Sequence, residues 1–174
     1  GGRKGHNTKY RGKPGYRPIL AFIQETREYL VGKLRKGASV SGQQAAAFIA
    51  DIENHLPSCV QEVLIRADGE FLSWQSVRAA MAAGFDFIIA NKGCNPKFDP
   101  SGWYRPWKRK VIEFNSCMHQ PQGWDYPFRF VAMRLPKEDK KSSNLPQQCV
   151  LFEDDKYTYR IFCTNLAVPA HKVV

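Results

Sequence analysis

One aspartate, Asp68, stands where an acidic side chain could bind a metal ion. It follows the apolar run VLIRA at residues 63–67 and precedes Gly69, so it ends an expected strand. In open α/β sheets, ligands collect at the carboxyl ends of parallel strands, and Mg²⁺ prefers oxygen ligands such as carboxylates. The alternative is an aspartate that simply begins a turn, and the local sequence fits that interpretation at least as well.

Basic residues concentrate in two runs that could contact a polyanion. The 174-residue chain has a formal net charge of +10 and a pI near 9.5. Lys and Arg side chains near phosphates release condensed counterions. Aromatic residues interleave the second run, which favours nucleic acid over a merely solvated basic face. The first run holds Arg3, Lys4, Lys9, Arg11, Lys13 and Arg17; the second holds Arg105, Lys108, Arg109 and Lys110, with Trp103, Tyr104 and Trp107.

Other kinds of site find little support in the sequence. The five cysteines lack C-x-x-C spacing, which indicates reduced thiols in a cytoplasmic protein rather than disulfides or zinc. The four histidines show no spacing suited to catalysis, and no Gly-rich phosphate loop follows a strand. No apolar run is long enough to span a bilayer. The two ends do not resemble natural termini, so we expect a piece of a longer protein.

A hairpin followed by a helix is expected ahead of Asp68. Residues 17–24 and 28–35 are apolar runs that predict two strands joined by a short connection. Ser41, with Gln44 three positions later, forms the capping-box pattern of a helix start. An apolar stripe at three- and four-residue intervals follows, and a proline ends it. This helix should pack on a sheet.

A strand–helix–strand unit is predicted around Asp68. Residues 62–68 form its first strand, residues 74–83 its helix and residues 86–92 its second strand. Gly84 sits where a left-handed residue often ends a helix. Such a unit implies two parallel strands with a right-handed crossover. We expect Asp68 to project from a strand in the middle of the sheet.

The composition changes after residue 92. The following segment is rich in Pro, Trp and Gly and contains β-like pieces, and residues 157–166 form a last strand. We therefore expect an α/β core that a mostly β insertion interrupts. The predicted parts are a basic arm or loop over 1–16, a first core part over 17–92, the insertion over 93–149 and a returning core segment over 150–174.

Several segments resemble DDE-type transposases of bacterial insertion sequences. LIRADGEFLSW at 64–74 and GFDFIIANK at 84–92 are similar to the second-aspartate region, where an Asp ends a strand and G-x-D-F-I-I-x-x-K marks the next. RPILAFIQET at 17–26, with the hairpin that follows, looks like the second and third core strands of that family. YRIFCTNL at 159–166 looks like its strand ahead of the catalytic helix. The resemblance covers nearly the whole chain and is weakest over 93–149.

The resemblance implies a ribonuclease H-like fold, an α/β mixed sheet with flanking helices. In that family two Asp and one Glu bind two Mg²⁺ or Mn²⁺ ions that serve phosphodiester cleavage and joining. Only Asp68 maps onto this set, as the catalytic and metal-binding residue. The first Asp belongs on a strand before Arg17, and the Glu on a helix after the TNL strand. We therefore expect the parent protein to be a transposase and the isolated chain to be inactive.

The resemblance also implies partners, which are the DNA of transposon ends and target, and it leaves a homodimer open. Some related enzymes carry a β-rich insertion that stacks on a base swung out of the duplex, worth about 1–3 kcal/mol per base. The competing interpretation buries at least two of the three tryptophans concerned in the insertion's own core. We expect a bacterial cytoplasmic protein associated with the nucleoid. The DNA-binding candidates are Arg3, Lys4, Lys9, Arg11, Lys13, Lys92, Trp103, Arg105, Trp107, Lys108, Arg109, Lys110 and Trp124.

Two other classes of function stay open. A basic α/β module could bind nucleic acid without chemistry, or the aromatic segment could serve as a dimer or partner surface. An Asp68 carboxylate exposed at the carboxyl end of a central strand, with an empty neighbouring position, favours the enzyme. A carboxylate capped by backbone amides in a plain turn favours the binding functions. A steep salt dependence of DNA binding would separate the nucleic-acid module from the partner surface.

Overall fold

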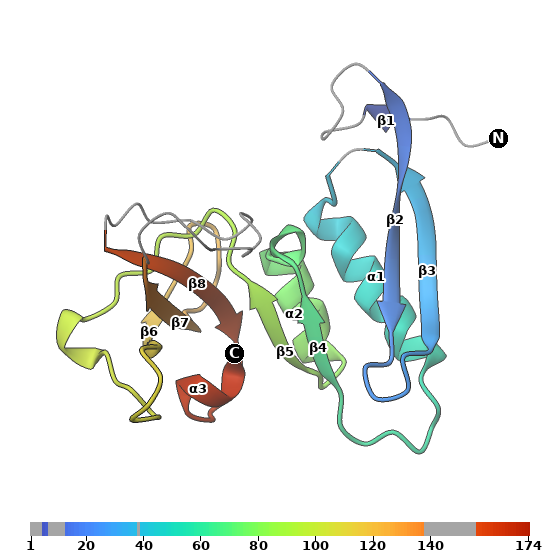
Figure 1. Cartoon of the computed structure of the whole chain (residues 1–174). Coiled ribbons are helices and arrows are strands. Elements are labelled where there is room, and N and C mark those ends of the chain that lie inside the picture. Colours follow the sequence, from blue (N-terminus) through green and yellow to red (C-terminus); the bar gives the residue numbers. More distant parts are fainter. Residues whose placement is uncertain (1–4, 7–12, 38, 138–155) are drawn as a thin grey trace.

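A computed structural model of the chain describes residues 5–6, 13–37, 39–137 and 156–174. Its strands form two sheets, a smaller one in the order β1-β2-β3 and a larger one in the order β4-β5-β8-β7-β6 (Figure 1). The architecture is mixed α/β and agrees with the ribonuclease H-like class that the resemblance implies. The strands are β1 (Gly5–His6), β2 (Pro14–Phe22), β3 (Tyr29–Lys36), β4 (Leu64–Ala67), β5 (Asp86–Ala90), β6 (Glu113–His119), β7 (Phe128–Pro136) and β8 (Tyr157–Thr164).

Strands β2 and β3 form the antiparallel hairpin that the sequence predicts. β2 begins at Pro14, earlier than predicted, and the Gly15 carbonyl accepts a hydrogen bond from the Gly37 N–H at 3.0 Å. β1 pairs with the same extension. Part of the predicted basic arm is therefore strand, and most of its other residues lie outside the described ranges.

Helix α1 (Gly42–His55) begins at the predicted capping box. The Ser41 hydroxyl accepts a hydrogen bond from the Gln44 N–H, and the Gln44 side chain accepts one from the Ser41 N–H. On the buried side of this helix, Phe48 packs in one cluster with Ile19 of β2. Helix α1 thus covers one face of the hairpin, as expected for an amphipathic helix on a sheet.

The predicted strand–helix–strand unit is confirmed. Strands β4 and β5 are parallel, with Ala67 opposite Ile89, and helix α2 (Trp74–Ala82) connects them. Gly84, just after the helix, has a φ of 70°, which is the left-handed conformation that the sequence predicts. Asp68 therefore follows the carboxyl end of a strand that has a parallel neighbour.

Strand β4 lies at the edge of the larger sheet, so the expectation of a mid-sheet position is wrong for the described residues. The reason is pairing: among these residues β4 pairs with β5 alone, and residues 16–22 of β2 pair with β3 alone. The hairpin therefore forms a separate sheet. Ile52 and Phe71 nevertheless pack against the buried clusters of both sheets, so the helix layer is shared.

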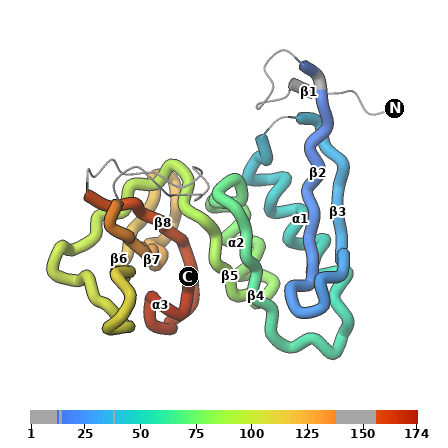
Figure 2. Tube along the Cα trace, viewed as in Figure 1, coloured from blue at the N-terminus to red at the C-terminus, as the bar shows by residue number. Residues whose placement is uncertain are grey.

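The described part of residues 93–149 extends the larger sheet. β6 pairs with β7 and β7 with β8, all antiparallel, and β8 returns to pair with β5. Figure 2 shows β8, in red, lying beside the green β5, although the two strands are far apart in sequence. The predicted β-like pieces and last strand are confirmed. The domain boundaries at 92 and 149 stay a prediction.

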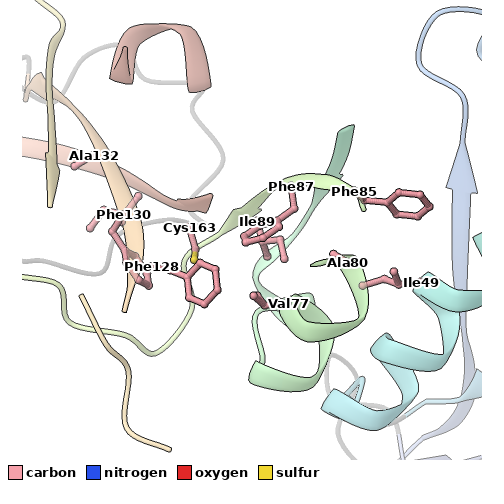
Figure 3. Close-up of a cluster of buried hydrophobic side chains, with 11 residues drawn as sticks. Ile49, Val77, Ala80, Phe85, Phe87, Ile89, Phe128, Phe130, Ala132 and Cys163 are labelled. Carbon is pink, nitrogen blue, oxygen red and sulfur yellow. The ribbon is translucent and has the colours of Figure 1, made fainter. Parts of the chain in front are cut away.

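The main core lies between the larger sheet and the helices α1 and α2. Phe87 of β5, Phe130 of β7 and Cys163 of β8 join Val77 of α2 and Ile49 of α1 in one buried cluster (Figure 3). On the other face of the sheet, the short helix α3 (Ala170–Val173) packs over a second cluster. None of the helices in the described ranges has the length and apolar character of a membrane span.

Candidate functional site

Asp68 lies directly after β4 and begins the short 3-10 helix η1 (Gly69–Phe71). Its Oδ1 accepts a hydrogen bond from the Glu70 N–H at 2.9 Å, and the residue is exposed. The backbone has a φ of −75° and a ψ of 172°, an extended conformation that is normal for an N-cap residue. Asp68 thus combines both sequence interpretations, because one oxygen caps a turn while the residue faces solvent at a strand end.

Gly69 allows the turn after β4 to approach the end of β5 closely. A Cβ atom at this position would stand 2.7 Å from the Cβ of Lys92 and 3.3 Å from the carbonyl oxygen of Ala90. Those atoms belong to the stem and backbone of the neighbouring segment and cannot easily move aside. Glycine at this position therefore keeps Lys92 beside the turn that carries Asp68.

The Glu70 carboxylate gathers two cations next to Asp68. Its Oε1 lies 2.8 Å from Arg17 Nη2 and 3.6 Å from Lys92 Nζ. Arg17 belongs to β2 and Lys92 follows β5, so this acid links the two sheets at the Asp68 edge. The sequence analysis missed Glu70 and its pairing with Arg17, because no local pattern signals a contact between residues so far apart in the chain.

Asp68 fits a divalent cation as one ligand of a larger set. Within the described ranges, no three His, Cys, Asp or Glu side chains are grouped so that they could hold a metal ion. Glu70 is the acid closest to Asp68 in sequence, but its carboxylate is engaged by Arg17 and Lys92. A solvent-facing carboxylate is a suitable oxygen ligand for Mg²⁺ or Mn²⁺.

The basic run at 105–110 is divided between structural and exposed side chains. Arg105 donates from Nε to Glu113 Oε1 at 2.9 Å, which ties it to β6. Lys108 and Arg109 are exposed. Lys110 places its Nζ 5.0 Å from the centre of the Trp107 ring. Of these cations, Lys108 and Arg109 are the most available to a phosphate.

Trp107 differs from the other two candidate tryptophans because it stays 40% exposed. Its ring packs edge-on against Phe114 and His171, and His171 in turn contacts the hydroxyl of Tyr104 through Nδ1 at 3.2 Å. The cluster joins the loop before β6 to helix α3. One edge of an anchored aromatic ring thus faces solvent beside the exposed cations.

Trp103 and Trp124 pack within the molecule. The centre of the Trp103 ring lies 4.0 Å from Cζ of Arg134. Trp124 lies 5.6 Å from Trp74 and 5.6 Å from Phe128, centre to centre. Both also adjoin the main core. This packing supports the structural interpretation for these two tryptophans.

An ion pair of low exposure holds β6 to β7. Arg134 Nε donates to Glu113 Oε2 at 2.6 Å. Burial opposes ionisation of the Glu113 carboxyl, but hydrogen bonds from Arg134 and Arg105 outweigh it and hold the pKa of this group below its usual value. The pair, with the tryptophan on one side of Arg134 and Tyr157 on the other, is a structural centre.

Side chains also fix the end of β8, in the TNL segment. Thr164 Oγ1 donates to the Phe87 carbonyl at 2.7 Å, and Asn165 Oδ1 accepts from the Phe87 N–H at 2.9 Å. Asn165 Nδ2 donates to the Phe85 carbonyl at 3.2 Å. The side-chain amide of Asn165 thus makes the two hydrogen bonds to β5 and the residue before it that the backbone of one more β8 residue would otherwise make. This clamp sets the point at which the chain leaves the sheet.

Of the first basic run, Lys13 and Arg17 belong to the described residues. Lys13 is exposed at the start of β2, and the remaining members of the run before it lie outside the described residues. Lys92, which follows β5, pairs with the carboxylate of Glu70, and the backbone N–H of Glu70 donates to Asp68. Among the described candidates, Lys92 thus lies at the Asp68 edge, and Lys110 contacts Trp107 in the second basic run. Those outside the described residues are Arg3, Lys4, Lys9 and Arg11.

The parallel β4–β5 unit and the mixed sheet with its helices agree with a ribonuclease H-like α/β fold, and the exposed Asp68 lies at the carboxyl end of β4. The sequence matches the family "Transposase DDE domain group 1" over residues 2–145. The chain belongs to this family, which confirms the resemblance seen in the sequence. Comparison with curated proteins gives no match.

Proposed function

We propose that this chain is the central part of the catalytic domain of a DNA transposase, which cuts and joins transposon ends by metal-dependent phosphodiester transfer. The observation that carries the proposal is the exposed Asp68 carboxylate at the carboxyl end of β4, beside the parallel strand β5. The family match over residues 2–145 supports it. In α/β sheets this edge is where ligands bind.

Asp68 acts in this proposal as one ligand of the catalytic Mg²⁺ or Mn²⁺. Its hydrogen bond from the Glu70 N–H orients the carboxylate without neutralising it. When bound, the metal supplies Lewis-acid stabilisation of charge on the scissile phosphate. Asp68 itself contributes a negative charge and a fixed oxygen at the edge of the sheet.

The companion acids are proposed to come from outside the described residues. Strand β4 and residues 16–22 of β2 each pair on one side only among the described strands. An added strand between them would join the two sheets, make β4 internal and bring a first Asp beside Asp68. The link from Arg17 to Glu70 supports this, because it keeps the two sheets within side-chain reach.

The described chain alone is proposed to be inactive, because one carboxylate holds Mg²⁺ weakly. The expected substrate is DNA, and the expected location is the cytoplasm of a bacterium, at the nucleoid. A homodimer stays part of the proposal. The hairpin face opposite α1 supports a contact surface, since Leu20, Phe22 and Leu34 are exposed on it.

The test is a nicking assay on the transposase that contains this chain. Asp68→Asn should lower Mg²⁺-dependent nicking by at least about a hundredfold, because a metal ligand's charge is lost. Asp86→Asn is the matched control, since it removes the same charge from the amino end of β5. Equal activity in wild type and Asp68→Asn would refute the proposal. Nicking by the isolated chain that Asp68→Ala abolishes would refute its inactivity.

A second candidate function is a DNA-binding module without chemistry. The net charge of +10 and the exposed Lys108, Arg109 and Trp107 favour it. In that case DNA affinity would fall steeply with salt, the wild-type protein would not nick DNA, and Asp68→Asn would not weaken DNA binding. The nicking assay therefore separates the two functions.

A further inference from the structure

We propose that a pocket between helix α2 and the connection from β6 to β7 binds one unpaired base of single-stranded DNA. The proposal rests on the proposed function, because it takes DNA as the partner of this chain. Family membership and the net charge of +10 favour a nucleic acid over a protein side chain as the occupant. The pocket has a volume of about 280 Å³. Three residues of α2 and two of the connection line it: Trp74, Arg78, Met81, Asp125 and Tyr126.

One wall of the pocket is a stripe along α2. Trp74, Arg78 and Met81 follow one another at intervals of four and three residues, so they lie on one side of the helix. The Ser73 hydroxyl caps the first turn by accepting a hydrogen bond from the Ser76 N–H at 3.2 Å. The capped turn fixes the tryptophan at the start of this wall.

The other wall is the β6–β7 connection, which Trp124 ties to the core. The centre of the Trp124 ring lies 5.6 Å from that of Trp74 and 5.6 Å from that of Phe128. The Gln120 side chain donates to the Trp124 carbonyl at 2.7 Å, within the same connection. These contacts hold residues 125–126 against α2. The pocket is therefore built from two anchored segments.

The aromatic side chains of the pocket form a corner that a flat ring can enter. The ring centres of Trp74 and Tyr126 lie 5.9 Å apart, and their planes meet at 67°. Tyr126 is 61% exposed and Met81 48%, so the apolar lining is open to solvent. Bases stack on aromatic rings, and a methionine thioether adapts to their shape. The volume lies just below the roughly 300–1,000 Å³ of small-molecule sites, which suits a single ring system.

The charged side chains of the pocket suit a base better than a phosphate. Cζ of Arg78 lies 5.9 Å from the centre of the Trp74 ring. Within the described part of the chain, neither Arg78 nor Asp125 belongs to an ion pair. The lining thus offers N–H donors and carboxylate acceptors whose charges cancel. Bases carry both donors and acceptors at their edges, whereas a phosphate carries acceptors alone. A duplex pairs those edges and stacks the faces, so the pocket selects an unpaired base.

The test compares two tyrosines of equal exposure. Affinity of the 174-residue chain is measured by fluorescence anisotropy for a labelled single-stranded oligonucleotide and for its duplex. Tyr126→Ala should weaken single-strand binding about tenfold, because stacking is lost, and leave duplex binding unchanged. Tyr29→Ala, which removes a 59% exposed tyrosine from the hairpin, should bind both DNAs as wild type does. Tyr126→Phe keeps the ring and should restore single-strand binding.

Two results of this comparison would overturn the proposal. One is an unchanged single-strand affinity in Tyr126→Ala, which is expected of a pocket that takes a protein side chain. The other is an equal loss in Tyr126→Ala and Tyr29→Ala, which would mean that exposed tyrosines act without regard to the pocket.

The role of Asp125 is tested by the sign of its effect. Asp125→Ala and Asp86→Ala each remove an exposed carboxylate. Loss of negative charge alone strengthens DNA binding. We therefore expect Asp86→Ala to bind single-stranded DNA at least as tightly as wild type. Asp125→Ala should bind it about threefold more weakly, because the base loses a hydrogen-bond acceptor. Equal tightening in both variants would contradict the proposal.

Photo-cross-linking locates the base directly. Iodouracil in single-stranded DNA cross-links under ultraviolet light to an aromatic side chain that it contacts. We expect cross-links of the wild-type chain at Tyr126 or Trp74, and none at these positions with the duplex. Cross-links at Trp107 alone, or failure of the chain to bind single-stranded DNA, would overturn the proposal. The nicking result for Asp68→Asn stands apart, because it concerns the metal ligand and not this pocket.

Discussion

The two ends of the larger sheet differ in how far their charged side chains are exposed. At the β6–β7 end, Arg134 lies between two aromatic rings and bonds Glu113 at 2.6 Å, so both charges are paired and of low exposure. At the β4 end, Asp68 is exposed, and Arg17 and Lys92, which pair with Glu70, are 37% and 58% exposed. Paired, enclosed charges hold a fold together, whereas exposed charges at a strand end serve ligands. The contrast explains why the β4 end, and not the Glu113–Arg134 pair, is the candidate for a metal site.

The largest expected effect on stability comes from removing the Arg134 side chain at the β6–β7 end. Arg134→Ala leaves the Glu113 charge poorly paired and opens the space between Trp103 and Tyr157, so unfolding should become easier by about 3 kcal/mol. Arg105→Ala is the control: it removes another partner of the same acid, but Arg105 is 53% exposed and Arg134 only 19%. That change should cost about 1 kcal/mol or less. Urea unfolding that gives equal losses would contradict the contrast.

The next effect concerns the clamp at the end of β8. Thr164→Val keeps the shape of a fully buried side chain but removes the hydroxyl that donates to the Phe87 carbonyl and accepts from the Leu166 N–H. The loss should be about 2 kcal/mol, because two backbone groups lose their partner. Thr158→Val, near the other end of the same strand, is the control and should change stability by less than about 0.5 kcal/mol. A loss in Thr164→Val no larger than the control would show that the clamp is dispensable.

Lowering the pH is expected to have a smaller effect on the free energy of unfolding. The Glu113 pKa is lowered in the folded protein, so its contribution to stability is complete above the unfolded value of about 4.3. That contribution is lost as the pH falls through the lower folded value. Urea unfolding from neutral to acidic pH should therefore show a shallower decline for Glu113→Gln than for wild type. If Glu113→Gln leaves the pH dependence of the free energy of unfolding unchanged, Glu113 does not contribute to it.

The smallest stability effect is expected at Asp68. Asn keeps an oxygen that can accept from the Glu70 N–H, and the residue is exposed, so Asp68→Asn should change the free energy of unfolding by less than about 0.5 kcal/mol. Thermal and urea unfolding would measure it. A loss comparable to that of Arg134→Ala would make Asp68 a structural residue and erase the contrast between the two ends.

Local chemistry made much of the fold predictable. The capping box of Ser41 and Gln44 and the left-handed Gly84 each depend on residues close in sequence, and both were found where the sequence placed them. The hairpin and the parallel β4–β5 unit followed from short apolar runs and their spacing. Asp68 could be selected for the same reason, since its place after a strand is a local property.

Long-range pairing could not be predicted in the same way. The edge position of β4 depends on which strands find partners, and the link between Arg17 and Glu70 joins segments from different sheets. The three candidate tryptophans look alike in sequence, yet Trp107 alone among them is exposed, at 40%, while Trp103 and Trp124 pack against the main core. Each of these features is decided by packing between distant segments, which hydrophobic periodicity does not encode.

The most direct test of the central claim exchanges the proposed metal ligand for a softer one. In the transposase that contains this chain, Asp68→Cys should lose DNA nicking with Mg²⁺, a hard cation that prefers oxygen, and regain part of it with Mn²⁺, which accepts softer ligands. Asp86→Cys should behave as wild type with both metals. Nicking by Asp68→Cys that is the same with Mg²⁺ as with Mn²⁺, at the wild-type rate, would contradict a metal-binding Asp68.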